Sequence, residues 1–365
     1  MGSTWGNAIK ISIFGESHGA GIGVVIDGFP SGVAYDEAFV LREMERRAPG
    51  RNKQSTARKE PDRPEIQSGI YNGKTTGTPV CIVIPNENTR SEDYTYGLAR
   101  PAHADHAAWC KYHGFEDYRG GGHFSGRVTA AVVAAGGILL PALESLGISV
   151  GTHILSCGGV RDRAFGDIKA ELAALGNKAF PVLDDECGEA MAREILKARE
   201  ENDSVGGVTQ TAVFGIPAGV GEPWFDSVES VISHAVFSIG GIKGIEFGAG
   251  FALGGMRGSE ANDALRIKNG AVVTETNNNG GINGGITNGM PIVFNCAVKP
   301  TPSVSREQET VDFIKNENAK ISIRGRHDPA IIRRICPVLD SVTALCLCDM
   351  LAQRYGTDAL TKGVK

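Results

Sequence analysis

Residues 26–33 read Ile-Asp-Gly-Phe-Pro-Ser-Gly-Val, and residues 213–220 read Val-Phe-Gly-Ile-Pro-Ala-Gly-Val. Each stretch follows a run of β-forming residues and precedes a helical pattern. A second pair recurs in the same order, Gly-Ile-Tyr-Asn-Gly-Lys-Thr-Thr-Gly-Thr-Pro at 69–79 and Gly-Ile-Asn-Gly-Gly-Ile-Thr-Asn-Gly-Met-Pro at 281–291. The preserved order predicts an internal duplication.

Strands and helices alternate in both copies, which predicts an α/β (α+β) fold in which helices cover sheets. The helical pattern at 35–47 recurs at 225–237, and the apolar stretch 128–143 is expected to form a core helix. We expect one pseudo-symmetric domain over residues 1–365. Its repeat halves would cover about 5–150 and 205–355, with an exposed helical insertion at about 161–202.

Composition restricts the class of protein. A chain of 365 residues with 41% hydrophobic content can bury one large core or two ordinary ones. A net charge of −5 argues against nucleic-acid and membrane-surface binding, which need a positive field. Residues 42–63 nevertheless hold eight cations against four acids. This basic segment predicts a small polyanionic ligand.

The cysteines indicate a reducing compartment. Eight are scattered, mostly in apolar runs, with no Cys-x-x-Cys pair. The first residues lack the basic and then apolar pattern of a secretory signal, and the stretch 128–143 is too short and too broken to span a bilayer. We therefore expect a cytoplasmic protein that binds no membrane.

Four polar clusters combine histidine or arginine with glycine or proline, at 15–19, 100–105, 119–127 and 325–329. His18 is interpreted either as part of a structural turn or as a proton donor near neutral pH. The glycines of 119–127 form either a flexible turn or an anion site at a helix N-terminus, and the flanking Arg119 and Arg127 favour the anion site.

Asp328 also has two interpretations. Followed by Pro329, it fits an N-cap for a helix through Arg334. A capping carboxylate at the end of this glycine-rich loop can still face a ligand, with Arg326 holding a phosphate or carboxylate beside it. Residues 299–303 fit a rim loop, and the Asn-Gly run 276–285 fits tight turns against which a flat ligand can lie.

Two other functions remain open at this point. His103, His106 and His113, with Cys110, have the side chains of a metallohydrolase site, although no second cluster supplies a further ligand and a base. A non-catalytic anion-binding protein is the other alternative. The glycines at 19–23 have the wrong spacing for a dinucleotide fingerprint.

These clusters, with Ser-Ile-Gly-Gly-Ile-Lys-Gly at 238–244 and Lys-Pro-Thr-Pro-Ser at 299–303, resemble the signature motifs of the chorismate synthase family from about residue 5 to residue 353. The resemblance implies a β-α-β sandwich and a homotetramer. It also implies a lyase that eliminates phosphate from 5-enolpyruvylshikimate 3-phosphate in a 1,4 sense, giving chorismate, with reduced FMN as cofactor and no net redox change.

The resemblance assigns roles residue by residue. His18 resembles the histidine near the departing phosphate, His103 the one that protonates the reduced flavin, and Asp328 the aspartate near flavin N5. We expect four substrate-binding cations: Arg42, Arg47, Lys53 and Arg127. The expected flavin-binding residues are His123, Phe124, Ser125, Gly240, Gly241, Gly284, Lys299, Pro300, Thr301, Pro302, Ser303 and Arg326. No metal is expected.

Some positions depart from the commoner family pattern: Ala48, Ala102, His123, Phe124, Gly126 and Val128. These departures affect the expected flavin contacts more than the reaction. The resemblance also associates the chain with NADP, but no reductase insertion is visible. We therefore expect an external flavin reductant.

Overall fold

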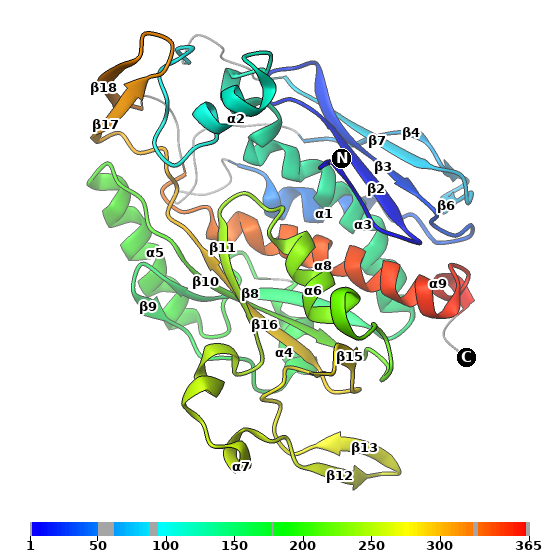
Figure 1. Cartoon of the computed structure of the whole chain (residues 1–365). Helices are drawn as coiled ribbons and strands as arrows, with labels where there is room; N and C mark the ends of the chain where they lie inside the picture. Colours follow the sequence, from blue (N-terminus) through cyan, green and yellow to red (C-terminus); the bar gives the residue numbers. More distant parts are fainter. Residues whose placement is uncertain (1, 50–61, 88–93, 177, 324–327, 363–365) are drawn as a thin grey trace.

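The computed structural model describes residues 2–49, 62–87, 94–176, 178–323 and 328–362. Two five-stranded antiparallel sheets enclose a layer of helices (Figure 1). The first sheet has the strand order β1-β2-β3-β7-β4. Its strands are β1 (Thr4–Trp5), β2 (Lys10–Gly15), β3 (Gly21–Asp27), β7 (Val80–Pro85) and β4 (Glu65–Ser68).

The second sheet has the order β11-β16-β10-β8-β9. Its strands are β11 (Ile242–Phe247), β16 (Ile292–Val298), β10 (Gly207–Phe214), β8 (Ser149–Cys157) and β9 (Val160–Arg161). Read from the other edge, this order repeats that of the first sheet, with β10 in the place of β3 and β16 in the place of β7.

The repeated motifs make the same turn in both halves. Gly28 and Gly215 have positive φ, and a Cβ on either would lie 2.1 Å from a backbone carbonyl oxygen. Thr75 Oγ1 donates to Pro30 O at 2.6 Å and accepts from Val33 N. Thr287 makes the equivalent bonds to Pro217 and Val220. The threonine of the second motif therefore holds the turn of the first.

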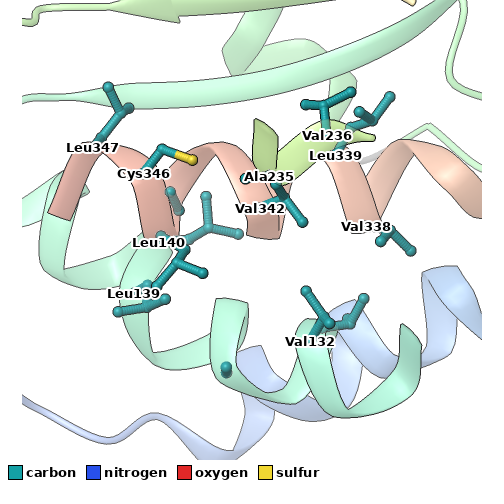
Figure 2. Close-up of a cluster of buried hydrophobic side chains, with 14 of the residues drawn as sticks. Val132, Leu139, Leu140, Ala235, Val236, Val338, Leu339, Val342, Cys346 and Leu347 are labelled. Atoms are coloured by element: carbon teal, nitrogen blue, oxygen red, sulfur yellow. The ribbon is translucent and has the colours of Figure 1, made fainter. Parts of the chain in front are cut away.

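Four helices form the middle layer: α1 (Glu37–Arg47), α3 (Thr129–Ser145), α6 (Val228–Val236) and α8 (Ile332–Tyr355). α3 packs on α8 and on the first sheet, and α8 packs on β8 and β10. Figure 2 shows the contact of α3, α6 and α8, where Leu139, Leu140, Val236, Leu339 and Val342 meet. One continuous apolar cluster thus joins both halves.

The other elements lie around this sandwich. Next to the cavity described below are α2 (Asp105–Tyr112), η2 (Arg119–Phe124), η3 (Gly126–Val128), β17 (Glu307–Asp312) and β18 (Glu317–Ser322). Residues 161–202 contain α4 (Ile168–Leu175) and α5 (Asp185–Glu200). The remaining elements are β5 (Ile70–Tyr71), β6 (Lys74–Thr75), η4 (Trp224–Asp226), η5 (Gly250–Gly255), α7 (Gly258–Ala261), β12 (Leu265–Lys268), β13 (Ala271–Thr274), β14 (Ile282–Asn283), β15 (Ile286–Thr287) and α9 (Ala359–Lys362).

The α/β prediction is confirmed, and the expected core helix at 128–143 is α3. α3 with its preceding turn (Gly126–Ser145) and α8 are long and apolar enough to cross a membrane, but most of α3 and all of the tested part of α8 are buried within the protein. Their apolar character is that of core helices.

Candidate active site

A cavity of about 660 Å³ is lined by residues of α2, η2, β18 and the start of α8. Its size is that of a small-molecule site. Most of its lining comes from residues 94–108, 116–127, 240–241, 299–303, 321–323 and 328–334, in whole or in part, and Ser17, Arg47, Pro49 and Phe313 complete it. The cavity therefore draws on both halves of the chain.

The floor of the cavity holds a buried ion cluster. Arg47 Nη1 donates to Asp62 Oδ2 at 2.9 Å, and Arg127 Nη1 pairs with Asp62 Oδ1. All three side chains are 1–4% exposed. Burial, together with Arg334 and Arg127, lowers the pKa of Arg47 to about 9, while Asp62 opposes this fall. The cluster carries a surplus of one positive charge.

Each guanidinium is also fixed by neutral acceptors. Arg47 Nε donates to Thr129 Oγ1 and its Nη2 to Gly126 O. Arg127 Nε donates to Asn86 Oδ1 at 2.7 Å, and its Nη2 to Pro85 O. The two arginines come from the end of α1 and from η3, so they approach Asp62 from different elements.

Asp328 is not the cap that the sequence also allowed. The N-cap of α8 is Ile331, which makes no side-chain cap bond. The Asp328 carboxylate instead pairs with Arg334, whose Nε donates to Arg47 O at 2.8 Å. Both Asp328 and Arg334 line the cavity. This pair extends the ion cluster to the start of α8.

His103 also lines the cavity. Its Nε2 shares a hydrogen bond of 2.8 Å with Ser303 Oγ. The loop carrying His103 is held by Lys299, whose Nζ donates to Ala102 O at 2.8 Å. Burial, and then the charge of Lys243, lowers the pKa of Lys299.

Asp105 is the first residue of α2 and follows the loop that carries His103. Burial alone would raise its pKa, but bonds from Arg100 at 2.7 and 2.8 Å lower it overall. Asp105 is therefore a fixed anion that neutralises Arg100 and orders the His103 loop.

His18 is not among the residues that line the cavity, but it contacts residues that do. Its ring meets Tyr94 edge-on, with centroids 5.4 Å apart. A Cβ on Gly120 would lie 2.1 Å from the His18 ring, so this glycine permits the ring to approach. Tyr94, Gly120 and the neighbouring Ser17 all line the cavity. The turn 15–19 thus places His18 at the edge of the cavity.

Most of the residues expected to bind the flavin line this one cavity. They are Phe124, Ser125, Gly240, Gly241, Lys299, Thr301, Pro302 and Ser303. Gly240 has open space where a Cβ would project. Thr301 Oγ1 is a buried oxygen without a hydrogen-bond partner among the described residues. Bare backbone beside an unsatisfied hydroxyl fits a flat polar ligand.

Several other residues expected to bind the substrate or the flavin do not line this cavity. Arg42 is 55% exposed and stacks on Phe39. His123 binds Gly15 O and Ser3 Oγ, which makes it a support for the β2 end. Gly284 lies in the turn between β14 and β15. Pro300 is likewise absent from the lining, whereas Lys53 and Arg326 lie outside the described residues.

The histidines of the metallohydrolase alternative do not converge. His106 contacts Cys110 at 3.5 Å and stacks on Trp109, while His113 ends α2. The part of the chain that the structure describes holds no group of three His, Cys, Asp or Glu side chains suited to a metal ion.

The sequence did not single out Asp62, Asn86, Tyr94 or Arg334 as site residues. Arg334 could have been found, because Arg333 and Arg334 are charges in the first turn of an apolar helix. Asn86 and Tyr94 carry no comparable pattern. Their importance comes from contacts with the turn 16–19, which lies far away along the chain: Asn86 donates to Glu16 O and Gly19 O, and Tyr94 meets the His18 ring.

A cavity that joins paired arginines, histidines and open glycine backbone defines an enzyme site for a small anionic ligand. Residues 9–352 match the family described as Chorismate synthase. A protein of Methanocella arvoryzae named chorismate synthase is 45% identical, over 96% of this chain and 94% of that protein. One of Thermococcus kodakarensis with the same name is 42% identical, over 98% of this chain and 99% of that protein.

Among solved structures, one titled "Crystal Structure of Chorismate Synthase" superposes with a TM-score of 0.77 at 27% identity, over 96% of this chain and 94% of that chain. The chain therefore belongs to the chorismate synthase family, the chorismate-forming lyases of the shikimate pathway in aromatic biosynthesis. Enzymes of this family act on a small phosphorylated substrate.

Proposed function

We propose that the chain eliminates phosphate from 5-enolpyruvylshikimate 3-phosphate in a 1,4 sense to give chorismate, with reduced FMN as cofactor and no net redox change. The main supporting observation is that His103, Asp328, Arg47 and Arg127 share one cavity, with His18 at its edge. The elimination breaks the bond between the ring carbon and the phosphate oxygen, and the ring also loses a hydrogen.

The basic residues account for binding and for departure of the phosphate. Arg47 and Arg127 present fixed guanidinium groups that can hold an anionic group at the cavity floor. The His18 imidazole is proposed to donate a proton to the leaving phosphate. The substrate carries carboxylates as well as a phosphate, so several cations at one site are needed.

The flavin is proposed to lie against Gly240, Gly241 and residues 299–303, where bare backbone and the Thr301 hydroxyl face the cavity. Reduced FMN supplies, when bound, electron density to the substrate and an acceptor for the ring hydrogen. His103, held by the hydrogen bond between its Nε2 and Ser303 Oγ, is proposed to deliver a proton on the flavin side of the cavity. The Asp328 carboxylate, paired with Arg334, is positioned as a proton acceptor.

We propose further that the chain acts in the cytoplasm as a homotetramer supplied by an external flavin reductant, with NADP as the associated nicotinamide cofactor. Association is supported by aromatic side chains that are 85–90% exposed: Trp224, Phe225 and Phe251. Apolar exposure of this degree favours a protein contact. Sedimentation equilibrium of the purified chain tests the tetramer.

The reaction is tested by phosphate release from the enolpyruvyl substrate under anaerobic conditions with chemically reduced FMN. Stoichiometric release of phosphate and chorismate is expected with reduced FMN and none with oxidised FMN. Phosphate release that is equal with reduced and with oxidised FMN would contradict the proposal. Activity should survive a chelator, because the proposed elimination uses the flavin and protein side chains. Loss of activity that zinc restores would favour the metallohydrolase instead.

A further inference from the structure

Asp62 is the central member of the ion cluster, yet it does not line the cavity. Its two carboxylate oxygens bind different guanidiniums, Oδ2 with Arg47 and Oδ1 with Arg127. At 1% exposure, the carboxylate is sealed from solvent behind the two arginines. It therefore cannot contact a ligand directly, and it acts only through its partners.

The Asp62 carboxylate has two opposite effects on anion binding by the cluster, and its charge alone does not decide which effect is larger. A carboxylate behind a cationic floor weakens the attraction of that floor for an anion. It also holds two buried cations in one arrangement, and removing one partner of such a network leaves uncompensated charge. These two effects have opposite signs, so a measurement can separate them.

The geometry favours the second effect. Asp62 holds the Nη1 atom of each arginine. The Nε and Nη2 atoms bind neutral acceptors on Thr129, Gly126, Asn86 and Pro85. Without Asp62, Arg47 and Arg127 would repel each other, and Arg334 lies close enough to add to this repulsion. The pair would then separate.

We propose that Asp62 is a positioning residue that holds Arg47 and Arg127 together as a two-arginine clamp for the phosphate group of the substrate. The inference rests on the proposed function for the identity of the substrate. The clamp itself requires only an anion of phosphate geometry. Binding of inorganic phosphate, without flavin or turnover, therefore tests it independently of the reaction.

The experiment is calorimetric titration of the full chain with inorganic phosphate, comparing wild type with Asp62→Asn. Asparagine has nearly the same shape but lacks the charge that draws both guanidiniums inward. We expect the dissociation constant to rise about tenfold or more, as when one partner of a buried charge pair is removed. Unchanged or tighter binding would overturn the proposal, because it would mean that Asp62 only reduces the positive field.

A second variant covers failure of Asp62→Asn to fold. Asp62→Glu keeps the charge and moves the carboxylate by one methylene. Because the proposal depends on the position of the carboxylate, the glutamate variant should also bind phosphate more weakly. Near-ultraviolet circular dichroism checks that this variant keeps the native fold. A folded glutamate variant with wild-type affinity would overturn the proposal.

Asp340 provides the matched control. It is 2% exposed and pairs with Arg46, the neighbour of Arg47 on α1, at 3.1 Å, but it does not line the cavity. Asp340→Asn should leave phosphate affinity unchanged. A double-mutant cycle completes the test: Arg127→Met and Asp62→Asn together should cost far less than the sum of their separate effects, since both disrupt one clamp. Additive effects would show that Asp62 acts elsewhere.

Discussion

Asn86 links Arg127 to the turn that carries His18. Its Oδ1 accepts from Arg127 Nε at 2.7 Å, and its Nδ2 donates to Glu16 O and Gly19 O, both at 2.9 Å. The two carbonyls flank His18 in the sequence. One amide therefore fixes the spacing between a cation of the cavity floor and the proposed proton donor.

Replacing Asn86 by Asp separates these two functions. The aspartate still accepts from Arg127, but it cannot donate to the carbonyls of residues 16 and 19. We expect kcat to fall about tenfold or more because His18 is no longer held in position, with a smaller change in KM. Steady-state kinetics under anaerobic conditions measure this split. Asn86→Ala, the control, removes both bonds and should raise KM as well, whereas wild-type kcat in the Asp variant would contradict the link.

The three proposed proton-transfer groups are tested by removing each one. His18→Ala and His103→Ala should each lower kcat about a hundredfold or more while the fold is kept, because general acid catalysis is worth that much. Asp328→Asn tests a carboxylate that is not a helix cap. It should be inactive yet fold normally, as judged by urea unfolding. A fully active variant at any of these positions would remove that residue from the mechanism.

Ala102 adopts a left-handed conformation, with φ of 59°. An L-residue there costs about 1–2 kcal/mol, and glycine loses about 0.4–1 kcal/mol through its freer unfolded chain. Ala102→Gly should therefore raise the free energy of unfolding by about 0.5–1 kcal/mol in urea titrations. Ala104, with φ of −86°, is the control. Its replacement by Gly should destabilise the protein, and the same sign at both positions would refute the strain argument.

The repeated motifs allowed the fold to be predicted, because Thr75 and Thr287 make the same bonds in both halves and the pattern is local. Family motifs pointed to Gly240, Gly241, Lys299 and residues 301–303 as flavin contacts, and these residues share one cavity. Asp62 was seen only as one acid in a basic segment. Its pairing with Arg127, 65 residues away, depends on how α1 and η3 meet, and no spacing in the sequence encodes that contact.

Asp340 lies on α8, buried against Arg46 of α1 and Thr152 of β8, and its environment gives the protein a defined pH dependence. Burial raises the pKa of its carboxyl to about 6, although Arg46 opposes the rise. The folded state therefore binds the proton more tightly than the unfolded state does. By linkage, the stability contributed by the protonated acid is present below about pH 4 and is lost as the pH rises through 6.

Comparison of wild type with Asp340→Asn isolates this effect, since asparagine does not ionise. Between pH 4.5 and pH 7.5, the wild type should lose about 1–3 kcal/mol of unfolding free energy relative to the variant. Urea unfolding at both pH values measures the difference. Glu275→Gln, at an exposed carboxylate paired with Arg266, should show no such trend. If wild type instead gained stability over this range relative to Asp340→Asn, Arg46 would be stabilising the ionised form and burial would not dominate.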